Sequence, residues 1–124
     1  MRSKRVIQKL IGCILLLLFT QCGTETKVIQ GFAIDKETNE PIAELLVEVF
    51  ECEAELFSSN DLGKAEEGIT NSEGYFSLEF IADKRADSWL LKFSSNQTKD
   101  NVAKYRDIAW FRNPGDTFEL ISNW

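Results

Sequence analysis

The chain contains no histidine. This absence excludes Ser-His-Asp triads, Cys-His dyads, most zinc sites and catalysis by an imidazole base. Proline (2 residues) and glycine (7 residues) are too scarce for a low-complexity chain. The sequence also has neither a glycine-rich phosphate loop nor a calcium loop of the EF-hand pattern. An enzyme is therefore the least expected function, and no cofactor or metal site is predicted.

Positive charge is scarce beyond the first residues. Residues 1–21 hold four of the 14 bases and no acid, so the remainder has 10 bases against 20 acids and a net charge of −10. Such a surface repels nucleic-acid phosphates, and no basic stripe interrupts it. Nucleic acid is thus not an expected partner, and the acidic surface is expected to serve solubility. The 124 residues, 44% of them hydrophobic, otherwise suit one globular domain with a short processing segment.

Residues 1–21 are typical of a targeting segment. Four bases lead into an apolar run from Leu10 to Phe19, about half the ~20 residues that span a bilayer as a helix. A basic start followed by a short apolar run predicts a secretory signal peptide, which is excluded from the fold.

The end of that run, Phe19-Thr20-Gln21-Cys22-Gly23, resembles the lipobox of bacterial lipoproteins, in its looser Bacteroidota-type form. The resemblance implies that Cys22 is lipidated and becomes the first residue of the mature chain. Gln21 stands where Gly, Ala or Ser is usual, and Phe19 where Leu is usual. Two alternatives remain open: cleavage by the ordinary signal peptidase, which would release a soluble protein, and an uncleaved signal anchor.

Lipidation would decide where the protein resides. Each buried methylene contributes ~0.8 kcal/mol, and a diacylglycerol plus an amide-linked acyl chain such as palmitate exceeds the two signals needed for stable anchoring. The expected location is the bacterial cell envelope, on the outer membrane facing the periplasm or the surface. Residues 22–27 are then expected to form a polar tether between the membrane and a domain of residues 28–124.

The cysteine count agrees with this assignment. Of the three cysteines, Cys13 leaves with the signal segment and Cys22 carries the lipid, so Cys52 remains alone without a disulfide partner. A lone thiol in an oxidising compartment is either buried and inert or free to pair between chains. We expect burial, because the flanking Glu51 and Glu53 also raise the thiol pKa.

From Lys27 onward, apolar and polar residues alternate with the period of a strand rather than of a helix. Turn residues separate these runs, and residues 53–68 are irregular enough to be assigned mainly to a loop. About seven short strands in about 100 residues predict an all-β, two-sheet antiparallel β-sandwich. The expected strands are residues 27–35, 45–50, 76–80, 88–93, within 102–111, and 117–121, with a further irregular one near 54–57.

The runs also match a family pattern. The stretches concerned are Lys27–Asp35, Thr38–Ile42, Val47–Val49 and Thr70–Leu78. They resemble the carboxypeptidase regulatory-like domain, over residues 28–80 well and 88–121 loosely. The resemblance implies a seven-stranded sandwich of the transthyretin (prealbumin) type, common in Bacteroidota envelope proteins. Asn39 replaces the usual glycine, which asparagine can do because it also tolerates left-handed φ.

The stretch from Thr70 to Phe80 changes abruptly from turn residues to alternation. Residues 70–73 suit a type I turn, and Gly74 supplies the positive φ that lets the chain reverse. Phe76 then begins the inward phase of a half-buried strand. We expect both Gly74 and Phe76 to be structural rather than catalytic.

Aromatic residues near the C-terminus are the remaining candidates for function. Trp110 and Phe111 are adjacent, so within a strand they face opposite sides, and one of them should point outward or lie under a loop. With Tyr105 they form the candidate ligand or partner contacts, because exposed aromatics stack on sugars or anchor partner proteins. The expected function is a non-enzymatic envelope lipoprotein that serves as a binding or accessory module, with an envelope protein or glycan as partner. The alternative is a carbohydrate-binding protein that uses these aromatics.

Overall fold

The computed structural model describes residues 25–54 and 59–124, and every regular element within them is a β-strand. The predicted all-β class is confirmed. The predicted Cys22 lipidation site lies outside the described residues. No helix within the described ranges is long and apolar enough to cross a membrane. The strands are β1 Glu25–Asp35, β2 Leu45–Ala54, β3 Ser59–Ile69, β4 Tyr75–Ala82, β5 Ser88–Ser95, β6 Thr98–Lys99, β7 Val102–Ala103, β8 Arg106–Trp110 and β9 Asp116–Leu120.

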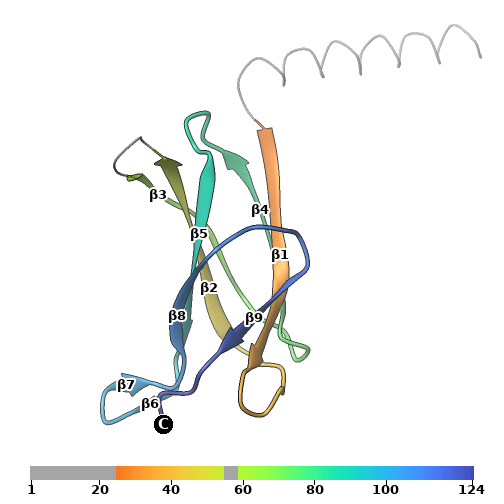
Figure 1. Ribbon diagram of the computed structural model, residues 1–124, viewed down its shortest axis with the longest axis vertical. Helices are drawn as coiled ribbons and strands as arrows, with labels where there is room; N and C mark the ends of the chain where they lie inside the picture. Colours follow the sequence, from red (N-terminus) through yellow and green to blue (C-terminus); the bar gives the residue numbers. More distant parts are fainter. Residues whose placement is uncertain (1–24, 55–58) are drawn as a thin grey trace, which may run out of the picture.

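Two sheets form the body of the domain, and Figure 1 shows them as two layers. One sheet has the order β4-β1-β9 and the other the order β3-β2-β5-β8, while β6 and β7 form a small separate hairpin. The β1–β4, β2–β3, β2–β5 and β5–β8 pairs are antiparallel. The β1–β9 pair is parallel, so the expectation of a purely antiparallel fold is wrong at this edge.

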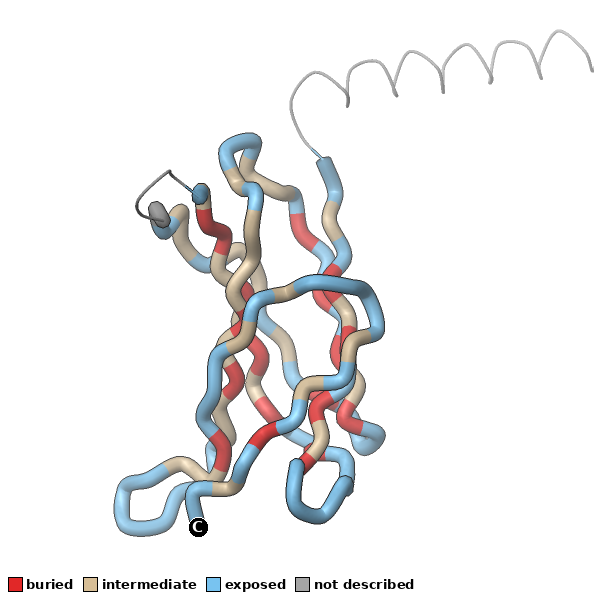
Figure 2. The backbone as a smooth tube through the Cα atoms, in the orientation of Figure 1, coloured by how far each residue is buried: buried red, intermediate tan, exposed pale blue. Residues whose placement is uncertain are grey.

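The core lies between the two layers. Along β2 and β4 the buried positions alternate with less buried ones, as the period-two pattern predicted, and Figure 2 shows this alternation along the backbone. At the centre, the rings of Phe76, Phe93 and Phe118 pack together with centroids 5.2–5.9 Å apart. Gly31 faces these rings, and a Cβ there would lie 2.8 Å from the Phe118 ring. The residue must therefore be glycine so that β1 can lie close to its neighbours.

Two expectations about boundaries are wrong. Residues 25–27, assigned to the tether, belong to β1. Residues 59–69, assigned mainly to a loop, form β3. The register of β3 against β2 shifts between Val49 and Phe50 and again between Glu51 and Cys52. These bulges interrupt the alternation and thereby hide the strand from a period-two search.

The turn before β4 spans residues 71–74, closed by a hydrogen bond from the Gly74 N–H to the Asn71 carbonyl (2.9 Å), and so lies one residue later than predicted. The predicted positive φ at Gly74 is confirmed. Gly74 adopts a φ of 74°, and a Cβ there would collide with the Ala33 carbonyl oxygen. The side chain of Asn71 accepts hydrogen bonds from the backbone N–H groups of Glu73 and Tyr75. Thr70 ties the turn to the rest of the fold, because its hydroxyl donates to the Ile42 carbonyl (2.7 Å) and accepts from the Leu45 N–H (2.9 Å). The stretch is thus a structural junction.

Candidate functional site

The outer face of the β3-β2-β5-β8 sheet carries apolar side chains where a solvated strand face is usually polar. The register places Phe50 of β2 opposite Leu90 of β5, and Leu90 opposite Trp110 of β8. In the next row Lys92 lies opposite Ile108. Ile108 is 61% exposed and Trp110 47%. A contiguous apolar patch on a soluble protein usually marks an interaction site.

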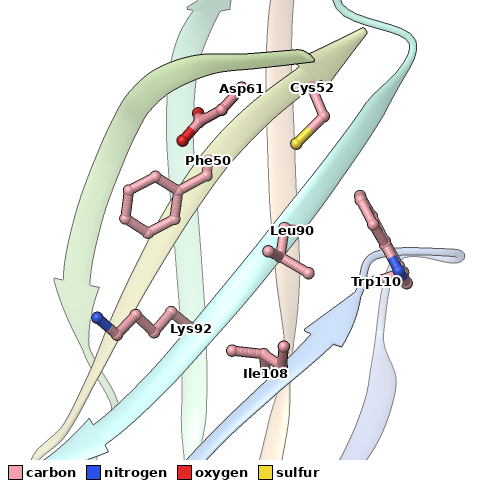
Figure 3. Close-up of a pocket in the computed structure, with 7 residues that line it drawn as sticks. All are labelled: Phe50, Cys52, Asp61, Leu90, Lys92, Ile108 and Trp110. Atoms are coloured by element: carbon pink, nitrogen blue, oxygen red, sulfur yellow. The ribbon is translucent and has the colours of Figure 1, made fainter. Parts of the chain in front are cut away.

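These side chains enclose a shallow slot of about 340 Å³. Figure 3 shows Phe50 and Trp110 on either side of Leu90, with Cys52 and Asp61 toward one end and Lys92 and Ile108 toward the other. Five of the seven lining residues are apolar, so the slot favours an apolar group over a strongly hydrated one. We refer to this feature as the outer slot, lined by Phe50, Cys52, Asp61, Leu90, Lys92, Ile108 and Trp110.

The two lysines near the outer slot differ in whether they form ion pairs. Lys64, on β3, forms ion pairs with Glu48 (3.6 Å) and Glu67 (3.4 Å). Lys92 lies opposite Glu48 on the neighbouring strand, yet within the described part of the chain it forms no ion pair. Asp61 accepts a hydrogen bond from the Gly63 N–H (2.7 Å) and stands at the opposite end of the slot. The slot therefore offers one cation at one end and one carboxylate at the other.

Cys52 lines the outer slot but has little reactivity. Its side chain is buried, as predicted. Burial raises the thiol pKa, and the carboxylates of Asp61 and Asp87 raise it further. The nucleophilic form is the thiolate, so this thiol is a poor nucleophile at neutral pH. Cys52 contributes a wall rather than chemistry.

The structure separates the three aromatics that the sequence grouped. Trp110 points outward into the slot. Phe111 packs partly buried against the core, with the Lys27 ammonium 5.7 Å from its ring centroid. The expectation that only one of these two neighbours faces outward is confirmed. Phe111 therefore does not join Trp110 in the slot.

Tyr105 is buried, with 8% of its surface exposed, which corrects its place among the candidate contacts. Its hydroxyl donates a 2.6 Å hydrogen bond to the buried carboxylate of Asp35. Burial and this bond raise the pKa of Tyr105 to about 12. The same bond, with the N–H groups of Glu37 and Thr38, lowers the pKa of Asp35. The pair fastens the turn after β1 to the chain before β8, and it offers no surface to a ligand.

Six of the seven lining residues were not among the sequence candidates for ligand contact: Phe50, Cys52, Asp61, Leu90, Lys92 and Ile108. The sequence contains a signal for two of them. Phe50 and Leu90 are apolar residues at outward-facing positions of strands whose inward-facing positions are also apolar. What the sequence does not contain is their alignment, which depends on the pairing of β2, β5 and β8.

The described residues contain no cluster of potential metal ligands. Across residues 25–54 and 59–124, no three cysteine, aspartate or glutamate side chains gather into a group that could hold a metal ion. The ionisable groups of the outer slot are one lysine, one aspartate and one thiol, separated by apolar side chains. The arrangement is suited to binding.

Comparison with protein-family models gives no match, and comparison with curated proteins gives none either. Among solved structures, the fold is similar to part of a 9R-lipoxygenase from Cyanothece PCC8801, with a TM-score of 0.52 and 17% sequence identity. The match covers 97% of this chain but only 22% of the lipoxygenase chain. At this identity the similarity concerns the fold alone, and the chain spans about a fifth of the enzyme's length.

Proposed function

We propose that the protein is a lipid-anchored component of the bacterial cell envelope, attached through Cys22, whose β-domain binds a partner protein and performs no catalysis. The domain is proposed to be of the carboxypeptidase regulatory-like, transthyretin-like type. In support of that type, two positions that carry the resemblance need unusual backbone geometry: Asn39 and Gly74 have φ values of 60° and 74°.

One observation carries the binding role: the outer slot combines an exposed tryptophan with apolar walls on an uncovered sheet face. Aromatic anchors next to a pocket, surrounded by charged residues, are the usual centre of a protein interface. On this face the charged surroundings include Lys64, Glu48 and Glu67. The partner is therefore expected to contact this sheet rather than the β4-β1-β9 sheet.

A pair of cross-linking variants tests the binding surface. A photo-reactive residue replaces Ile108, which is 61% exposed beside the slot, or Ile81, which is 65% exposed on β4 of the other sheet. In intact cells, the variant at Ile108 should form a discrete cross-linked adduct that the variant at Ile81 does not. Adducts of equal yield from both positions, or from neither, would contradict a binding role for this face.

Mass spectrometry of the mature protein tests the anchor separately. The proposal requires the first residue to be Cys22 and to carry acyl chains. An unmodified Cys22, or a mature chain that begins elsewhere, would refute the lipoprotein assignment. The binding surface does not depend on this result.

The second candidate function is carbohydrate binding, and the exposure of Trp110 favours it. The half-exposed indole lines the same slot as Asp61 and Lys92, so it can stack on a sugar ring whose hydroxyls meet the charged groups at the two ends. Glycan-array binding that is lost in Trp110→Ala would support it. The apolar walls contributed by Phe50, Leu90 and Ile108 make it the weaker of the two.

A further inference from the structure

We propose that the outer slot receives an apolar side chain of a partner polypeptide that is adjacent to a carboxylate, with Lys92 as the group that recognises the carboxylate. This inference rests on the proposed binding role of the face and adds the chemistry of the partner. Three observations support it: the exposure of the slot's walls, the charges at its two ends and the hydrogen bonding of the neighbouring sheet edge.

The exposure of the slot's walls favours a polypeptide over a small molecule as the occupant. Pockets for small ligands bury roughly 70–90% of the ligand surface. Here two of the walls, Ile108 and Trp110, are themselves 61% and 47% exposed, so a free small molecule would keep much of its surface in water. A side chain presented by a partner protein avoids this problem, because the partner's own surface covers what the slot leaves open.

The charges select the kind of side chain. Lys92 is a half-buried cation that lines an apolar slot and has no ion-pair partner among the described residues. The nearby Lys64 is already paired with Glu48 and Glu67, so among the residues that line the slot Lys92 is the cation available to an incoming carboxylate. At the other end, Asp61 repels anions and can accept an N–H from a peptide backbone. The complementary segment therefore carries an apolar residue with an acidic residue on one side.

The free edge of the sheet is a less favourable binding site for a partner polypeptide than the outer slot. β8 is the last strand of its sheet, where an added strand could pair with exposed backbone groups. However, the Ile108 N–H donates a 2.8 Å hydrogen bond to the side chain of Asp107. A charged residue that occupies an edge N–H discourages strand addition.

Three capped tetrapeptides test the inference: GFDG, its neutral counterpart GFNG and its basic counterpart GFKG. The mature chain in detergent is titrated with each while two signals are followed. One is the indole N–H resonance of Trp110, identified by its loss in Trp110→Phe. The other is the side-chain methyl resonance of Ile108, identified by its loss in Ile108→Val. Both report on the outer slot because both side chains line it.

We expect GFDG to bind about fivefold more tightly than GFNG and more tightly still than GFKG, as one partly exposed ion pair allows. The preference should vanish in Lys92→Met and persist in Lys84→Met, in which the altered lysine is exposed in the turn between β4 and β5. Equal binding of the three peptides, or a preference unchanged by Lys92→Met, would overturn the role of Lys92.

Other outcomes identify other occupants and also overturn the inference. Shifts of both resonances caused by glucose or glucuronate but by none of the peptides would assign the slot to a saccharide. Shifts that grow with protein concentration alone would assign it to a second copy of the chain. Failure of the peptide preference while the cross-links from position 108 remain would reject the acidic partner but leave the proposed binding surface intact.

Discussion

Replacement of Phe76 by alanine is the perturbation whose size the structure determines best. The side chain is 2% exposed, and its ring contacts the Phe93 and Phe118 rings with centroids 5.9 Å apart in both cases. These rings come from β4, β5 and β9, so the cavity would lie where the two layers meet. Phe→Ala in such a position costs ~3–5 kcal/mol from lost transfer energy and the cavity left behind.

That cost is a large part of the stability of such a domain, which is typically ~5–15 kcal/mol. Urea unfolding followed by tryptophan fluorescence measures it, with a chain that begins at residue 24. At an m-value of roughly 1.5 kcal/mol/M, the midpoint should fall by about 2–3 M. Gly74→Val should also be damaging, because a β-branched residue at positive φ adds strain of order 1–3 kcal/mol.

Two matched controls decide whether the reasoning holds. Phe32→Ala removes the same side chain from the outer face of β1, where it is 36% exposed and packs against Tyr75, and we expect a much smaller loss. Ser72→Ala, in the exposed turn, should be nearly silent. The core assignment would be refuted by a midpoint in Phe76→Ala no lower than in Phe32→Ala. Damage from Ser72→Ala equal to that from Phe76→Ala would reopen the case for a site in the turn.

Three further predictions concern other parts of the molecule. Gly31→Ala should lower the melting temperature through a loss of ~1–3 kcal/mol, because the new Cβ would lie 2.8 Å from the Phe118 ring; unchanged melting would disprove the close approach. Trp110→Ala should alter the free energy of unfolding by no more than ~0.5 kcal/mol while the cross-link at the outer slot disappears, and a loss typical of a core residue would make it structural. In a Tyr75→Phe variant, the absorbance of the remaining phenol should titrate near 12 rather than 10. Because the folded pKa of Tyr105 is raised, its contribution to stability is complete below pH 10 and is lost as the pH rises through about 12; an ordinary midpoint in the folded protein would contradict the buried pair with its carboxylate partner.

Much of the strand pattern was predictable because it depends on neighbours in the chain. The alternation in residues 45–50 and 76–80 places every second side chain on one face, and these residues lie in β2 and β4. The positive φ at Gly74 was likewise predictable, since the need for reversal is visible in the adjacent turn residues. By contrast β3 was missed, because its two register shifts break the alternation that identifies a strand.

The candidate site was predictable only in part. Trp110 was identified because adjacent aromatics in a strand must face opposite sides, and the structure places it outward with Phe111 against the core. Tyr105 was assigned to the same group because it lies close in sequence. Its hydrogen-bond partner Asp35 is 70 residues away in the chain, and no local sequence pattern predicts a hydrogen bond across that separation.

The sequence by itself determined the features that depend on residue type and on neighbours in the chain: the four bases and the apolar run of residues 1–21, the lack of histidine and the alternation of most strands. Only the tertiary structure decided that β9 pairs in parallel with β1 and that Phe50, Leu90 and Trp110 form one row. The physical reason is that an outward-facing side chain acquires walls only from neighbouring strands. Those strands are about 40 and 20 residues apart in the chain, and their register is set by hydrogen bonds across the whole sheet.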